Sequence, residues 1–186
     1  MRIVLRSIAA VMAWALLAAA SAQTPPAAKP VGAYRNTIWE DLTPKDWDPM
    51  KEFRDMKSGA PLSDNDPRAN EMLLRLRKAW DAAPANPAME GAAIRIPGFL
   101  VPLEDTKAGM KEFLLVPYFG ACIHSPPPPA NQIIHVLPKT PAQGLRSMDA
   151  VWVSGTMKLV RSDTSMGTSG YRMDAVLVEP YAPPPR

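Results

Sequence analysis

The residues best suited to chemistry lie in one short stretch, YFGACIHSPPPPANQ, at positions 118–132. It contains the single cysteine, Cys122, and one of the two histidines, His124. On an extended backbone, side chains two positions apart point to the same side, so thiol and imidazole would face one ligand together. Thiolate sulfur and imidazole nitrogen are good ligands for zinc and Cu(I). The spacing is therefore compatible with a metal site, and zinc is the cofactor it suggests.

Two ligands do not complete a zinc sphere, which usually has four. The remaining candidates are the second histidine, His135, and a carboxylate such as Glu104. Because the sequence offers so few candidate ligands, it favours an open, exchangeable metal site over a closed structural one. Asn131 and Gln132 follow the prolines and would support the site by hydrogen bonds to the imidazole or to the loop backbone.

The same stretch has readings without a metal. Cys122 is compatible with a small core side chain, because free cysteine is among the most buried residue types. A nucleophilic thiol activated by His124 is a further interpretation. Residues two apart on a strand rarely reach the geometry that a base and its nucleophile need. The sequence also contains no other hydrolase or redox motif. We therefore do not expect an enzyme. The stretch also suits partner docking, through a stiff run of prolines flanked by aromatic side chains: Tyr118, Phe119, Pro126, Pro127, Pro128 and Pro129.

The elements that must position these residues are mainly strands. Alternating or continuous apolar runs predict five strands, at 93–104, 112–118, 131–137, 150–160 and 170–181. Glycines inside the first and fourth runs, Gly98 and Gly155, predict bends or bulges. We expect a mostly β protein, a small five-stranded OB-like barrel with an N-terminal helix and an irregular arm. The helix is predicted to open at Asp66-Pro67. Its apolar side chains recur at helical spacing, and we expect them to pack in the core: Met72, Leu73, Leu76, Ala79 and Trp80.

The chain divides into four segments. Residues 1–22 have a basic start, an apolar run and a small-residue cleavage site, which is typical of a signal peptide and predicts export to the periplasm. Residues 23–36 form a Pro/Ala-rich linker, 37–90 the arm and helix, and 91–182 the barrel domain. Without Arg2 and Arg6, the 21 Lys and Arg become 19 against 18 Asp and Glu. A nearly neutral mature chain does not suggest a nucleic-acid binder. The sequence gives no indication of the oligomeric state.

Four stretches together resemble a known family. IWEDLTP, IPGFLVPLE, EFLLVPYFGACIHSPPPPANQ and GYRM occur in this order between residues 38 and 173. They are similar to exported bacterial proteins that form a domain of unknown function with a PYFGACIH-PPPP-NQ signature. The resemblance implies a periplasmic or lipoprotein-type protein with an OB-like barrel. It also gives a weak indication that the protein handles zinc. Because some members are encoded beside ABC transporter components, it also implies an accessory role with periplasmic or membrane transporter partners. The resemblance supplies no reaction and does not extend to His135.

Overall fold

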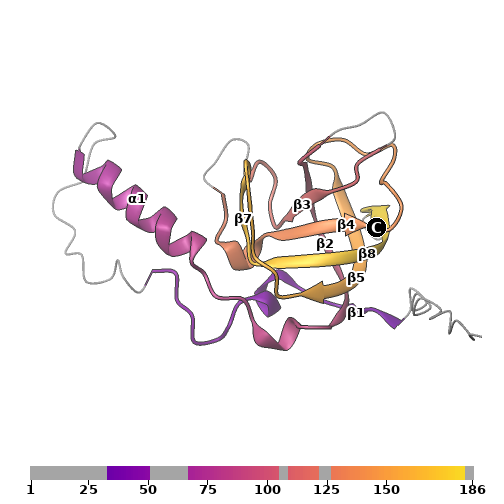
Figure 1. Cartoon of the computed structure of the whole chain (residues 1–186), viewed down its shortest axis with the longest axis horizontal. Coiled ribbons are helices and arrows are strands. Elements are labelled where there is room, and N and C mark those ends of the chain that lie inside the picture. Colours follow the sequence, from indigo (N-terminus) through magenta and orange to yellow (C-terminus); the bar gives the residue numbers. More distant parts are fainter. Residues whose placement is uncertain (1–32, 51–66, 105–108, 122–126, 183–186) are drawn as a thin grey trace, which may run out of the picture.

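Five long strands form the body of the protein. The computed structural model describes residues 33–50, 67–104, 109–121 and 127–182. The strands are β2 (Ala93–Pro102), β3 (Phe113–Val116), β4 (Ile134–Pro138), β5 (Ala150–Lys158) and β8 (Tyr171–Pro180) (Figure 1). Each corresponds to one of the apolar runs in the sequence, with ends shifted by a few residues.

The five strands close into a barrel. Round it they follow the order β2-β3-β4-β8-β5, and β5 pairs again with β2. All neighbours are antiparallel except β4 and β8, which run parallel. An antiparallel meander of three strands followed by this crossover is the Greek-key connectivity of the OB fold. The predicted small five-stranded barrel is therefore confirmed.

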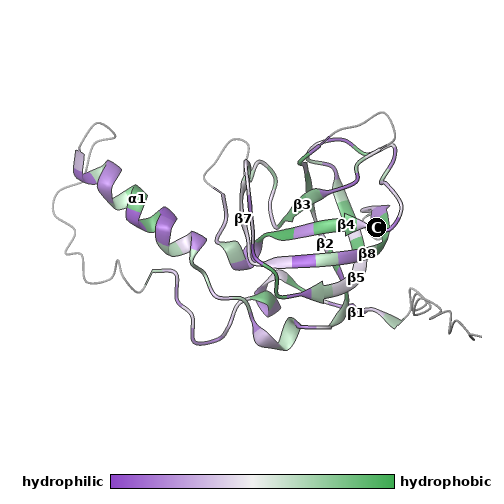
Figure 2. Cartoon of the chain, in the orientation of Figure 1, coloured by the Kyte–Doolittle hydropathy of each residue, from purple (hydrophilic) through white to green (hydrophobic). Residues whose placement is uncertain are grey.

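Alternating side chains of these strands fill the barrel. On β2, Ile94, Ile96 and Leu100 are completely buried, and on β8 Tyr171 and Met173 are. Figure 2 shows the contrast between the hydrophobic barrel strands and the more hydrophilic helix. Because every second residue of a strand faces inward, the apolar alternation in the sequence was enough to predict this core.

Two glycines allow the barrel to close. Strand β2 pairs with β5 up to Phe99 and with β3 from Phe99 onward, so it must bend. A Cβ atom on Gly98 would lie 2.8 Å from Leu115 Cγ and 2.9 Å from Trp39 Cζ2. At Gly155 the register of β5 against β8 shifts, and a Cβ atom there would lie 2.6 Å from the Asp174 carbonyl oxygen. Only glycine permits these close approaches without displacing a neighbour.

The N-terminal arm covers one end of the barrel. Strand β1 (Arg35–Asn36) pairs in parallel with the start of β2, and a 3-10 turn, η2 (Trp39–Leu42), follows. Leu42 is completely buried in the main core, and Trp39 packs against that core. Apart from β1 and this turn, the described part of the arm is irregular, as predicted.

A second, smaller apolar cluster lies outside the barrel. Leu114 and Val116 on β3 face away from the main core and meet Val101, Ala121 and Ile133. A hairpin of β6 (Ser162–Thr164) and β7 (Gly167–Ser169) adds Met166 to this cluster. This hairpin lies between the fourth and fifth predicted strands and was not predicted, because strands this short leave no periodic pattern in the sequence. The remaining short elements are the 3-10 turns η4 (Pro87–Met89) and η5 (Ala130–Gln132).

The helix α1 (Pro67–Asp81) projects from the barrel (Figure 1). It begins at Pro67, as predicted, but none of its residues is buried. The prediction that its apolar side chains pack in the core is therefore wrong. Only its C-terminal end meets the barrel region, where Arg161 donates a hydrogen bond to the Asp81 carbonyl. No helix in the described ranges is both long and apolar enough to cross a membrane.

Candidate functional site

The candidate site is the β3–β4 loop, residues 117–133. Its two described parts, 117–121 and 127–133, are firmly held, since Ala121, Pro128, Ala130 and Asn131 are buried. The predicted site residues Cys122, His124 and Pro126 lie outside the described residues.

Asn131 and Gln132 hold the end of this loop to the rest of the chain. The Gln132 amide donates to the Trp39 carbonyl at 3.0 Å and to the Thr43 hydroxyl at 2.8 Å. The Asn131 amide donates to the Pro84 carbonyl at 3.1 Å. Both side chains thus tie the loop to the arm and to the segment after α1. Asn131 Oδ1, although buried, has no hydrogen-bond partner within the described ranges.

A groove with a volume of about 440 Å³ lies where the loop meets the arm. One wall comes from the arm, one from β2 and one from the two described parts of the loop. Its lining is mostly aromatic and proline side chains with one carboxylate: Ile38, Trp39, Glu40, Pro97, Pro117, Tyr118, Pro128, Pro129 and Gln132. Three of the four stretches that carry the family resemblance therefore converge on one groove.

Two aromatic side chains beside the groove face outward. Tyr118 is 45% exposed and Phe119 is 68% exposed. Phe119 meets Phe99 edge-on, with ring centroids 5.9 Å apart. A large aromatic side chain that is held at one edge and otherwise exposed is typical of a protein-contact residue. Pro127 and Pro129 are half-buried, and Pro128 packs inside.

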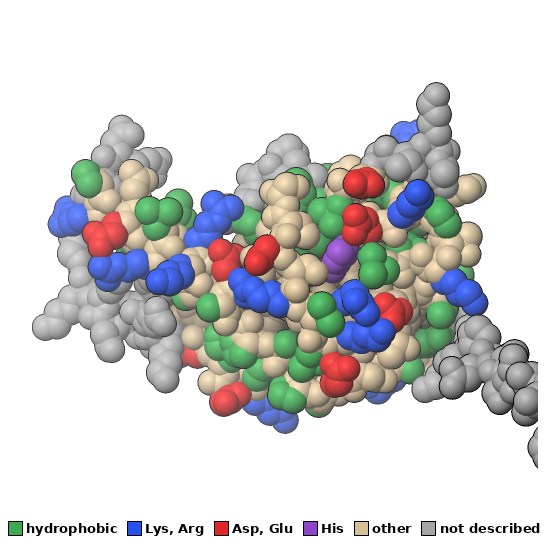
Figure 3. Space-filling model, in the orientation of Figure 1, with side chains coloured by type: hydrophobic (Ala, Val, Ile, Leu, Met, Phe, Trp, Pro, Cys, Tyr) green, Lys and Arg blue, Asp and Glu red, His purple; other side chains and the backbone are tan. Residues whose placement is uncertain are grey.

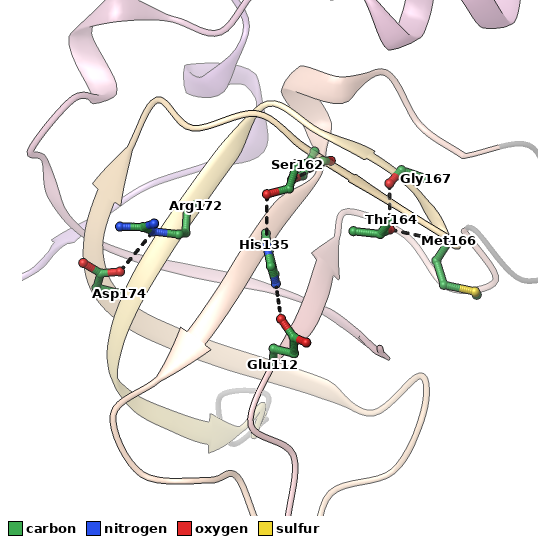
Figure 4. Close-up of polar contacts among 9 residues, drawn as sticks. Glu112, His135, Ser162, Thr164, Met166, Gly167, Arg172 and Asp174 are labelled. Carbon is green, nitrogen blue, oxygen red and sulfur yellow. Dashed lines mark hydrogen bonds and ion pairs between the residues drawn. The ribbon is translucent and has the colours of Figure 1, made fainter. Parts of the chain in front are cut away.

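His135 sits elsewhere, on the outer face of β4 (Figure 4). Its Nε2 is 2.8 Å from Glu112 Oε2, and its Nδ1 is 3.3 Å from Ser162 Oγ. Because a carboxylate can only accept, Nε2 donates to Glu112, while Nδ1 pairs with the Ser162 hydroxyl. Both ring nitrogens are therefore engaged, and the contacts join the hairpin to the barrel.

The structure does not gather the other predicted metal ligands. Glu104 follows β2 and is exposed. Within the residues that the structure covers, no three His, Cys, Asp or Glu side chains form a group that could hold a metal ion. Cys122 and His124 are not among these residues.

The hydrogen-bond partners of His135 and Tyr171 could not be predicted from the sequence. Glu112 and Ser162 are 23 and 27 residues from His135 in sequence. Tyr171 is 85 residues from Asn86, whose backbone N–H donates to its hydroxyl. Only the closed barrel brings such residues together, and no local pattern predicts these contacts.

Comparison with known proteins agrees with the barrel. The sequence profile of DUF3299, a family of proteins of unknown function, matches residues 39–180. Among solved structures, the chain is similar to the crystal structure of a DUF3299 family protein from Pseudomonas aeruginosa PAO1. The two are 38% identical, with a TM-score of 0.63, over 81% of this chain and 98% of that chain. No curated protein matches the chain.

Proposed function

From the premise that the chain belongs to the DUF3299 family, we propose that it is an exported binding protein that engages a partner through the β3–β4 loop and the groove beside it. The partner we propose is a periplasmic or membrane component of a transport system. The observation that carries the proposal is the groove lined by Trp39, Tyr118 and prolines, with Phe119 exposed at its side.

The hydrogen bonds that hold the end of the loop favour a role in binding over a simple connection between two strands. Its end is held by Gln132 to the arm and by Asn131 to the segment after α1. A surface that is already ordered loses little conformational freedom when a partner docks. Exposed aromatic side chains then supply contact area at low entropic cost, as they do at the centres of many interfaces.

The fold class gives independent but weaker support. OB barrels commonly bind their ligands on the face of their second and third strands, together with the loops that join strands one and two and strands four and five. Here the second and third strands are β3 and β4, which lead into and out of the candidate loop. This argument is an analogy between folds, since one fold serves many functions.

Zinc binding through Cys122 and His124 is the second candidate. The observation in its favour is Asn131 Oδ1, which is buried and without a described partner. A buried acceptor of this kind usually bonds to a donor nearby, and the second ring N–H of a metal-bound imidazole is such a donor. His135 would join such a site only by giving up Glu112 or Ser162, and Glu104 is not grouped with other ligands among the described residues.

Variants of the exposed aromatics test partner docking. The pair Tyr118→Ser and Phe119→Ser, made together, should lower recovery of the transport component when the protein is purified from the cells that export it. Val160→Ser, at an exposed apolar position beyond the far end of β5, is the control and should leave recovery unchanged. Equal recovery with all three proteins would contradict the docking proposal.

The metal candidate has its own test. Protein purified without chelator should contain about one zinc per chain by elemental analysis, and Cys122→Ser and His124→Ala should each lose it. Added zinc should also raise the melting temperature of the wild type only, because a ligand that binds the native state stabilises it. No zinc in the wild type after addition would remove the metal candidate and leave the docking proposal standing.

A further inference from the structure

The apolar side chains of α1 share one face, on which Met72 and Leu73 are exposed and the others are half-buried. The helix has no buried residue. With about 100° between successive residues, six of its side chains fall within about a third of the circumference. We name them the apolar stripe: Ala69, Met72, Leu73, Leu76, Ala79 and Trp80. Leu73 is 51% exposed and Met72 is 37% exposed.

Basic side chains border this stripe. Arg68 and Arg77 each lie about 90° from its centre, on opposite sides. The helix contains four basic residues, Arg68, Arg75, Arg77 and Lys78, against two acidic ones, Glu71 and Asp81. Glu71 is paired with Arg75 at 2.6 Å. Figure 3 shows hydrophobic and Lys or Arg side chains together on the surface of the projecting helix.

We propose that α1 rests flat on an anionic lipid surface, with the apolar stripe in the boundary between headgroups and acyl chains. An amphipathic helix with an apolar face and basic borders has the features of an interfacial helix. Long arginine side chains at the edges keep their charge among the headgroups while their stems cover apolar surface. This inference concerns a different part of the molecule from the β3–β4 loop and does not depend on the function proposed for it.

The charge pattern favours lipid over a second copy of the chain. The helix carries four basic residues against two acidic ones, so two such helices packed stripe to stripe would repel each other, whereas anionic headgroups would attract each of them. The helix also projects from the barrel, so a flat membrane could reach the stripe (Figure 1).

Vesicle flotation with the full-length protein tests the proposal. The probes are vesicles of phosphatidylglycerol mixed with phosphatidylcholine, and vesicles of phosphatidylcholine alone. We expect binding to the first kind, weakened by added salt, and much less to the second. Leu73→Glu should weaken binding by about tenfold, because it places a charge in the stripe.

Leu74→Glu is the matched control. Leu74 is 69% exposed and points about 100° away from Leu73, so the variant adds the same charge outside the stripe. Any N-terminal apolar segment is the same in both variants. Equal weakening by the two substitutions, or no binding to anionic vesicles, would overturn the proposal. So would a dimer in sedimentation that Leu73→Glu dissociates without any change in flotation.

Discussion

At the scale of single residues, a few polar side chains join the arm and the candidate site to the barrel. The Tyr171 hydroxyl donates to the Leu42 carbonyl at 2.6 Å and accepts from the Asn86 N–H at 2.5 Å. Asn86 in turn donates from its side chain to the Asp41 carbonyl at 2.7 Å. One phenol therefore links β8, the arm and the segment after α1.

Tyr171→Phe should lower the stability of the protein without changing its fold. The substitution keeps the ring in the core but leaves the Leu42 carbonyl and the Asn86 N–H without their partner. Loss of such buried hydrogen bonds should reduce the free energy of unfolding by about 1–3 kcal/mol. Urea denaturation followed by fluorescence measures the change, and an unchanged midpoint would contradict the role given to the hydroxyl.

The same residue should make stability fall at high pH. Burial raises the pKa of Tyr171, an effect that the hydrogen bond from Asn86 partly opposes. The unfolded chain releases this proton near the usual value of about 10, while the folded chain retains it to higher pH. The contribution is therefore complete below pH of about 10 and is lost as pH rises towards the folded pKa.

Comparison with Tyr171→Phe isolates this contribution from other groups that titrate in the same range. Between about pH 9 and 11, the free energy of unfolding should fall more steeply for the wild type than for the variant. Parallel pH profiles for the two proteins would mean that Tyr171 has the same pKa in the folded and the unfolded chain, which would contradict the prediction.

At the scale of elements, the β3–β4 loop and the arm depend on each other. The Gln132 amide supplies both hydrogen bonds from the end of the loop to the arm residues Trp39 and Thr43. Trp39 also donates from its indole to the Pro97 carbonyl at 2.7 Å, which fixes the base of the groove. Loop, arm and β2 therefore form one surface.

Gln132→Glu should separate the loop from the arm. The new carboxylate has the same shape but cannot donate, and it would face the Trp39 carbonyl oxygen. We expect a loss of about 1–3 kcal/mol in the free energy of unfolding and weaker partner binding. Lys139→Gln, at an exposed position after β4, serves as a control and should leave both unchanged. Normal partner binding by Gln132→Glu would show that the groove does not need this link.

Much of the element structure could be predicted from local pattern. Gly98 and Gly155 marked the places where strands bend or shift register, because only a residue without a side chain fits there. The sequence wrongly predicts that Met72, Leu73, Leu76, Ala79 and Trp80 of α1 lie in the core, because amphipathic periodicity shows that a helix has an apolar face but not what covers that face. The contacts of His135 with Glu112 and Ser162 required the closed barrel and had no signal in the sequence.

At the scale of the whole molecule, the arm completes the barrel core. Leu42 is completely buried among residues of the main core, although it precedes the first barrel strand by about fifty residues. The four resemblance stretches also meet in three dimensions, since the arm, β2 and the β3–β4 loop line one groove and β8 supports the arm. Fold and candidate site are therefore built from the same contacts.

Leu42→Ala should destabilise the whole domain and not only the arm. Removing a completely buried leucine side chain leaves a cavity and costs about 2–5 kcal/mol. Unfolding should remain a single transition, because the arm and the barrel share one core. Ile38→Ala, at a side chain of the same arm that is 59% exposed, should cost much less. An early, separate transition in Leu42→Ala would contradict a shared core.

Site-specific photo-crosslinking in the native cells tests the central claim, that this protein binds its partner through the β3–β4 loop. A photoreactive amino acid at position 119, where the side chain is 68% exposed, is compared with one at position 160, where it is 36% exposed. The proposal predicts a crosslink from position 119 to a transport component, identified by mass spectrometry, and none from position 160. Crosslinks to the same protein from both positions, or to no protein from position 119, would contradict it.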